Sequence, residues 1–132
     1  MASSMETRMR VLVIDDSRTV RIIIRQALAE AGLNVIEAAN GRDGLDQLRA
    51  HDDVELVLVD WNMPEMNGLE FVQAVRAERS YDPVRIMMVT TETEQEQVVR
   101  ALNAGANEYL MKPFTKEVLV AKLSLLDAFG GD

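Results

Sequence analysis

Hydrophobic and polar positions follow two different periods along this chain. Continuous apolar runs of four to six residues are typical of strands buried on both faces of a parallel sheet. Short runs rich in Val, Ile, Leu and Met, most with one or two polar residues among them, fall at residues 11–14, 33–36, 54–59, 84–89 and 107–111. Between them, apolar residues recur at spacings of three and four, which indicates helices with one buried face. The two patterns alternate as five βα units, and we therefore expect an α/β fold.

The predicted helices have recognisable starts and stops. The first follows Ser17 and ends at Gly32, and the fourth ends at Gly105, since glycine favours the left-handed conformation that ends many helices. The others begin after Gly41, after Asn67-Gly68, after Thr93 and after Thr115. Right-handed crossovers favour a doubly wound five-stranded parallel sheet with helices on both faces. In the common strand order 2-1-3-4-5, the first and third strands are neighbours.

Charged residues stand at the ends of three apolar runs. Asp15 and Asp16 follow the first run, Asp60 ends the third, and Lys112 ends the last. The carboxyl ends of parallel strands meet at one edge of the sheet, so we expect these four side chains to converge. Two carboxylates ~4 Å apart repel by about 4 kcal/mol at an effective dielectric of roughly 20. Such a cluster is unfavourable unless it binds a cation and does phosphate chemistry.

The donor atoms that the sequence offers predict which cation would bind at this cluster. The chain has no cysteine and one histidine, His51, which excludes thiolate and histidine-cluster sites. Oxygen ligands select a hard cation, Mg²⁺, with Mn²⁺ as a substitute. A single aspartate at a strand end is usually a turn former or a helix cap. Two acidic strand ends together with a Lys-Pro pair after the last strand indicate a cation and phosphate site more specifically than a single aspartate does.

Length and composition limit the domain organisation and the kinds of partner that we expect. The 132 residues fit one domain, which we place at residues 9–128 with a frayed tail at 1–8 and a short tail at 129–132. The net charge of −8 disfavours binding to nucleic acid or to an anionic membrane. No apolar run reaches the ~20 residues of a membrane span, and the first ten residues lack the apolar region of a secretory signal. We expect a cytoplasmic protein without an output domain.

From Arg10 to Leu126 the chain resembles response-regulator receiver domains, and the segment D-W-N-M-P-E-M-N-G from Asp60 to Gly68 is especially similar to stand-alone chemotaxis regulators. The resemblance implies a flavodoxin-like fold with Asp60 as phosphoacceptor. It also implies that Asp15, Asp16, Asp60 and the backbone carbonyl of Asn62 bind Mg²⁺.

The resemblance further implies a switch. Lys112 and Thr90 would stabilise the phosphoryl group, and Thr90 together with Tyr109 would change position when phosphate is present. Thr91 lies beside Thr90, so the assignment could slip by one residue; the spacing to Lys112 favours Thr90.

Two further features follow from the same resemblance, and a third follows from the adjacency of Trp61 to Asp60. Asn62 and Glu92 each lie two residues beyond a site residue, where the family uses side chains to tune the access of hydrolytic water. The family pattern also predicts a cis peptide bond between Lys112 and Pro113, which would aim the lysine into the site. Trp61 is expected to belong to the loop and to report metal binding.

These features favour a single-domain response regulator of a two-component system. It would accept phosphate from a sensor histidine kinase and then bind a target such as a flagellar motor switch protein. It would be a switch that catalyses its own phosphorylation and dephosphorylation, not an enzyme. It would act as a monomer or weak dimer, with a phosphatase as a further partner. The nearest alternative is a relay that passes phosphate to a histidine phosphotransfer protein. An Mg²⁺-dependent aspartyl-phosphate hydrolase is disfavoured, because that type requires a D-x-D motif after the first strand, where this chain has Asp15-Asp16-Ser17.

Overall fold

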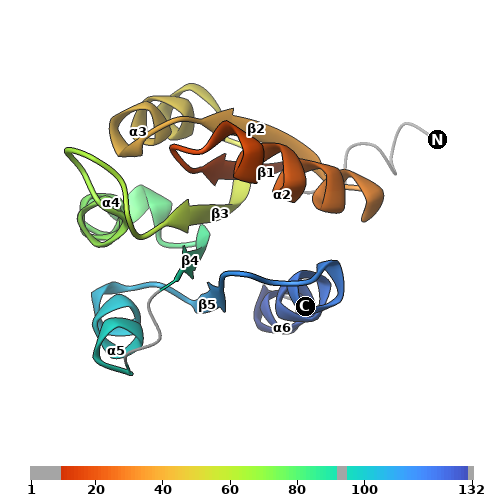
Figure 1. The fold of residues 1–132 in the computed structure, drawn as a ribbon. Coiled ribbons are helices and arrows are strands. Elements are labelled where there is room, and N and C mark those ends of the chain that lie inside the picture. Colours follow the sequence, from red (N-terminus) through yellow and green to blue (C-terminus); the bar gives the residue numbers. More distant parts are fainter. Residues whose placement is uncertain (1–9, 92–94, 131–132) are drawn as a thin grey trace.

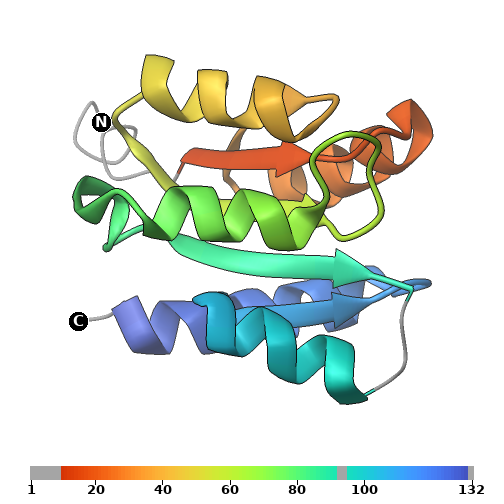
Figure 2. The same cartoon turned by 90° about the vertical axis from the view of Figure 1, so that its left-hand side faces the viewer.

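A parallel sheet forms the centre of the molecule. The computed structural model describes residues 10–91 and 95–130. Within them lies one five-stranded sheet in the order β2-β1-β3-β4-β5, with every neighbouring pair parallel. The strands are β1 (Arg10–Ile14), β2 (Asn34–Ala38), β3 (Val54–Asp60), β4 (Arg85–Thr90) and β5 (Glu108–Met111). The predicted fold class and strand order are confirmed, and all the carboxyl ends lie at one edge (Figure 2).

Helices cover both faces of the sheet (Figure 1). One face carries α2 (Arg18–Glu30) and α6 (Lys116–Gly130), and the other carries α3 (Gly41–Ala50), α4 (Gly68–Arg76) and α5 (Gln95–Ala104). A short 3₁₀ helix, η1 (Arg79–Tyr81), lies between α4 and β4. Among the described residues, no helix has the length and apolar character that crossing a membrane requires.

Each face of the sheet has its own hydrophobic core. Successive residues of a strand point to opposite faces, so Leu12 packs with Phe71 on the α3–α4–α5 side and Val13 packs with Leu28 on the α2–α6 side. Both faces of β1 are therefore buried, which explains why the central strands are continuously apolar instead of alternating.

Helix N-termini gather at the carboxyl edge of the sheet. The Ser17 side chain accepts from the amide of Val20 and caps α2, and the Asn40 side chain accepts from the amide of Asp43 and caps α3. Asn67 forms a reciprocal capping box with Glu70 at the start of α4. These caps provide hydrogen-bond acceptors for backbone amides of the first turn that have no partner within the helix. They also fix the residue at which each helix begins.

The second strand lies further along the chain than its apolar run suggests. The sequence pattern places it at 33–36, whereas β2 spans Asn34–Ala38. β2 is an edge strand, and its residue Glu37 forms ion pairs with Arg21 and Arg25 of α2. A charged residue thus takes part in the sheet at a position where an apolar pattern ends.

Candidate functional site

Three aspartates meet at the carboxyl edge between β1 and β3. These strands are neighbours in register, with Ile14 opposite Val59, so the residues that follow them are brought together. Asp15, Asp16 and Asp60 each place a carboxylate oxygen within 4.8 Å of the others. Asp15 and Asp60 are only 1% and 4% exposed, while Asp16 is exposed to solvent. The structure brings together the acidic residues that the sequence analysis selected.

Lys112 reaches this cluster from the end of β5. Its Nζ lies 3.0 Å from Oδ2 of Asp15 and 3.3 Å from Oδ1 of Asp60, within hydrogen-bonding reach of both. Its backbone amide donates to the carbonyl oxygen of Thr90 at 2.8 Å, which anchors the lysine to the end of β4. The Lys112–Pro113 peptide bond is cis.

The charges of the cluster are only partly balanced by the lysine. Burial, and then the negative charge of Asp15, raise the pKa of Asp60, although Lys112 opposes this change. Burial tends to lower the pKa of Lys112, but its hydrogen bond to Asp15 and the charges of both aspartates outweigh burial and raise that pKa. Lys112 thus pairs with two of the three carboxylates, and a cation bound here would relieve the remaining repulsion.

The donor set fits a hard divalent cation. Every ligand atom in the cluster is a carboxylate oxygen, and the oxygens are close enough to contact one ion together. Mg²⁺ typically binds one or two carboxylates and keeps several water molecules. Because Asp16 is exposed to solvent, an ion at this cluster could keep such water molecules.

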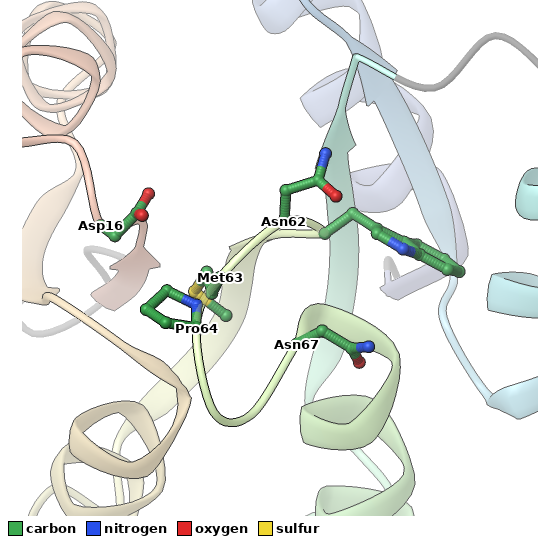
Figure 3. Close-up of a pocket in the computed structure, with 6 residues that line it drawn as sticks. Asp16, Asn62, Met63, Pro64 and Asn67 are labelled. Carbon is green, nitrogen blue, oxygen red and sulfur yellow. The ribbon is translucent and has the colours of Figure 1, made fainter.

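A pocket of about 400 Å³ opens beside the cluster. It is lined by Asp16, Trp61, Asn62, Met63, Pro64 and Asn67. In Figure 3, Asp16 lies on one side, Asn62 and Asn67 lie on the other, and Met63 and Pro64 lie between them. The polar walls and the volume leave room for a hydrated cation together with a phosphoryl group.

The loop from β3 to α4 forms one wall of this pocket. The backbone amide of Trp61 donates to the carbonyl of Val89, which continues the β3–β4 ladder, and the amide of Gly68 donates back to the carbonyl of Trp61 at 2.9 Å. A Cβ on Gly68 would lie 2.5 Å from the carbonyl oxygen of Asp60. Helix α4 therefore begins directly against the backbone of the proposed phosphoacceptor, which only glycine permits.

The structure also places the remaining residues from the sequence analysis. Thr90 ends β4 and is 2% exposed, whereas Thr91 is exposed. Tyr109 lies opposite Met88 on the neighbouring strand β5, and the Nζ of Lys122 lies 4.2 Å from the centroid of its ring. Glu92 lies outside the described residues.

Sequence reasoning missed one residue of the site. The guanidinium of Arg21 donates from Nη1 to the backbone carbonyl of Asp15 at 2.6 Å. Arg21 is one of three arginines in α2, and no local pattern distinguishes it from Arg18 or Arg25. Only the tertiary structure shows which of them touches the acidic loop.

Known proteins resemble the chain over most of its length. Residues 11–124 match the family described as the response regulator receiver domain. A chemotaxis protein CheY homolog of Campylobacter jejuni is 50% identical over 116 residues, which cover 87% of this chain and 89% of that protein. Chemotaxis protein CheY1 of Helicobacter pylori is 44% identical over 119 residues, covering 89% of this chain and 96% of that protein.

Solved structures share the fold. The chemotaxis response regulator CheY4 of Vibrio cholerae superposes with a TM-score of 0.86 at 38% identity, covering 91% of this chain and 99% of that one. A probable two-component system response regulator/GGDEF domain protein superposes with a TM-score of 0.87 at 35% identity, covering 93% of this chain but only 51% of that one. The same fold thus occurs over a whole chain and as half of a longer one.

Proposed function

The chain belongs to the response regulator receiver domain family, and from this premise we propose that it is a cytoplasmic phosphorylation switch in which Asp60 accepts a phosphoryl group. Proteins of this family act as signalling switches and not as conventional enzymes. The observation that carries the assignment is the position of Asp60, which lies beside two further aspartates and within 3.3 Å of Lys112.

The proposed transfer is a displacement at phosphorus. A carboxylate oxygen of Asp60 attacks the phosphorus of a phosphohistidine on a sensor kinase, so that an O–P bond forms while the N–P bond breaks. The histidine leaves with the bonding electrons and takes up a proton. Lys112 then donates a hydrogen bond to a phosphoryl oxygen, and so does the hydroxyl of Thr90.

We assign Asp15, Asp16, Asp60 and the backbone carbonyl of Asn62 as the residues that would hold Mg²⁺, with Mn²⁺ as a substitute. The ion supplies charge neutralisation to the transferring group. The buried Asp15 contributes a fixed ligand because Ser17 and Arg21 hold it in place, while the exposed Asp16 and Asn62 face the pocket through which the donor enters.

Phosphorylation would be read out through β4 and β5. Thr90 and Tyr109 lie on adjacent strands near the site, so an inward movement of the Thr90 hydroxyl toward phosphate would vacate space for the Tyr109 ring. The surface formed by α5, β5 and α6 would then change its affinity for a target. Given the chemotaxis proteins among its relatives, we propose a flagellar motor switch protein as that target.

The test is phosphorylation by a small donor. Incubation with acetyl phosphate and Mg²⁺ should add one phosphoryl group, seen by intact-protein mass spectrometry, and hydroxylamine should remove it as expected for an acyl phosphate. Asp60→Asn should abolish the adduct, whereas Asp52→Asn, at an exposed acidic residue remote from the cluster, should not. An adduct that persists in Asp60→Asn would exclude this assignment.

The same phosphorylated sample separates a switch from a relay. A switch should bind motor switch protein more tightly after phosphorylation and should keep its phosphate in the presence of a histidine phosphotransfer domain. Rapid loss of phosphate to that domain without a change in target binding would favour the relay instead.

A further inference from the structure

One arginine of α2 connects its helix and strand β2 to the acidic loop. Arg21 lies in the first turns of α2, and its Nη1 donates to the carbonyl oxygen of Asp15 at 2.6 Å. Its Nε donates to Oε1 of Glu37, on the edge strand β2, at 3.0 Å. The second oxygen of Glu37 accepts from Arg25 at 2.6 Å. A single guanidinium therefore connects α2, β2 and the loop that follows β1.

The arrangement holds Arg21 in one orientation. Its side chain is only 15% exposed, and that of Glu37 is 23% exposed. A guanidinium donates in a rigid planar fork, so a bond to Glu37 at one position fixes where the other donors point. The hydrogen bond from Arg25 is the largest influence on Glu37 and lowers its pKa, with Arg21 adding to it against the effect of burial. Glu37 thus stays ionised and orients Arg21.

The atom that Arg21 contacts belongs to the peptide unit joining Asp15 to Asp16. This unit is planar, so fixing its carbonyl oxygen fixes the plane from which both side chains leave. On the other side of Asp15, its backbone amide donates to the carbonyl of Ala38 at 3.2 Å. The amide of Ser17 then binds Oδ1 of Asp15 at 2.8 Å. Arg21 completes this set of restraints from the helix side.

We propose that Arg21 is a positioning residue of the cation site, which orients Asp15 and Asp16 through their shared peptide unit and thereby sets the affinity for Mg²⁺. This inference rests on the proposed function, since it concerns the same site. Residues that orient metal ligands without touching the metal commonly alter affinity by about 10- to 100-fold when removed.

If Arg21 acted only through its charge, its removal would change the Mg²⁺ affinity in the opposite direction. Arg21 is a positive charge one hydrogen bond away from the backbone of Asp15, and it should repel a cation bound there. If Arg21 acted only through its charge, replacing it with a neutral residue would strengthen Mg²⁺ binding. If it acts by positioning, the replacement weakens binding. The sign of the change therefore distinguishes the two roles.

The experiment compares two arginines that share Glu37. Arg21→Met keeps the aliphatic stem but removes the donors to both Asp15 and Glu37, whereas Arg25→Met removes only a bond to Glu37. Mg²⁺ is titrated into metal-free protein while the fluorescence of Trp61, the sole tryptophan, is followed. We expect Arg21→Met to weaken Mg²⁺ binding by about tenfold and Arg25→Met to leave it within about twofold.

A second measurement needs no metal. In metal-free Arg21→Met the amide of Ser17, which binds Oδ1 of Asp15, should exchange with deuterium faster than in Arg25→Met at matched overall stability. Arg21→Lys retains one donor and should recover part of the affinity; it also provides the comparison if Arg21→Met does not fold.

Unchanged or tighter Mg²⁺ binding in the Arg21 variants, or equal weakening in Arg25→Met, would overturn the proposal. A wild-type protein that binds no Mg²⁺ would instead contradict the proposed function, and the exchange of the Ser17 amide would then decide the role of Arg21.

Discussion

At the scale of single residues, Lys112 and a bound cation compete for the same carboxylates. The ammonium lies 3.0 Å from Asp15 and 3.3 Å from Asp60, so in the metal-free state it supplies the positive charge that a divalent ion would otherwise provide. The same group would later bind the phosphoryl oxygens. In the proposed function, Lys112 would stabilise the transferred phosphoryl group and would weaken cation binding, and a substitution separates these two effects.

Lys112→Met should strengthen Mg²⁺ binding and slow phosphorylation. Removing a positive charge within 4 Å of two ligands lowers the repulsion felt by the ion, and we expect an affinity at least about threefold higher. Phosphorylation by acetyl phosphate should fall by about 10- to 100-fold because an oriented donor to the phosphoryl group is lost. Lys116→Met, at an exposed lysine paired with Glu30, is the control. Weaker Mg²⁺ binding in Lys112→Met would contradict this account.

Asp60 should make the metal-free protein less stable at neutral pH. Burial and Asp15 raise its pKa in the folded state above the usual carboxyl value. Its contribution to stability is therefore fully present below the ordinary aspartate pKa and is lost as the pH rises through the raised one.

Asp60→Asn should therefore unfold at a temperature roughly 2–5 °C higher than wild type at pH 7 without metal. The difference should disappear as the pH falls below the ordinary aspartate pKa, and added Mg²⁺ should reduce it by stabilising the wild type. Thermal unfolding by circular dichroism across this pH range checks the sign. A variant that is less stable than wild type at pH 7 would show that ionised Asp60 is favourable in the fold.

The sequence indicated the charged residues of the candidate site better than the residues that hold them in place. Asp15, Asp60 and Lys112 follow apolar runs, and the geometry of parallel sheets brings strand ends together. Arg21 acts through a contact to a backbone atom, which leaves no pattern in the sequence. Trp61 lies in the loop after β3, as expected, but the sequence did not show that it is 7% exposed and packs into the core, with its amide continuing the ladder to β4.

At the scale of elements, the junction of β3 with α4 controls the position of Asp60. The start of α4 is so close to the end of β3 that a Cβ on Gly68 would lie 2.5 Å from the carbonyl oxygen of Asp60 and 2.9 Å from the Cα of Trp61. Both neighbours are backbone atoms, which cannot move aside without shifting the strand end. The position of the proposed phosphoacceptor thus depends on the packing of a helix that contributes no side chain to the acidic cluster.

Gly68→Ala should reduce stability by about 1–3 kcal/mol, because the added methyl group forces α4 away from β3. Gly41→Ala is a matched control at the first residue of another helix. There the added Cβ would meet only the flexible side chain of Met66, at 2.9 Å, so the loss should be smaller. Urea denaturation measures both. Equal losses would show that α4 can shift without strain.

The element boundaries were least predictable where charge enters the sheet. The first, third, fourth and fifth strands lie within one residue of their apolar runs at each end. The second strand continues through Glu37 because two arginines of α2 satisfy its carboxylate. These ion pairs between β2 and α2 extend the strand, and the order of apolar and polar residues along the chain does not reveal them.

At the scale of the whole molecule, the sheet order makes folding and assembly of the site one event. Asp15 follows β1, Asp60 ends β3 and Lys112 follows β5, so they meet only when β1, β3, β4 and β5 have paired in that order. An ion that binds this cluster binds the folded state alone. Its binding energy is then added to the stability of the fold.

Thermal unfolding should therefore shift upward with Mg²⁺. At a concentration ten times the dissociation constant, linkage adds about 1.4 kcal/mol, or roughly 4–7 °C for a domain of this size. Sodium chloride at equal ionic strength is the control for the screening of the net charge of −8. The double variant Asp15→Asn/Asp16→Asn should not respond to Mg²⁺ beyond this control. A response of wild type no larger than that to sodium chloride would place the ion elsewhere.

The hydrogen bond from Gly68 back to Trp61 has a consequence for protein engineering. It joins the two ends of the β3–α4 loop at its base, so the residues between them form a closed unit whose entry and exit are side by side. The six residues from Asn62 to Asn67 could be exchanged with those of a relative as a cassette. This would transplant four of the six residues that line the pocket while leaving the aspartates, the lysine and the sheet in place.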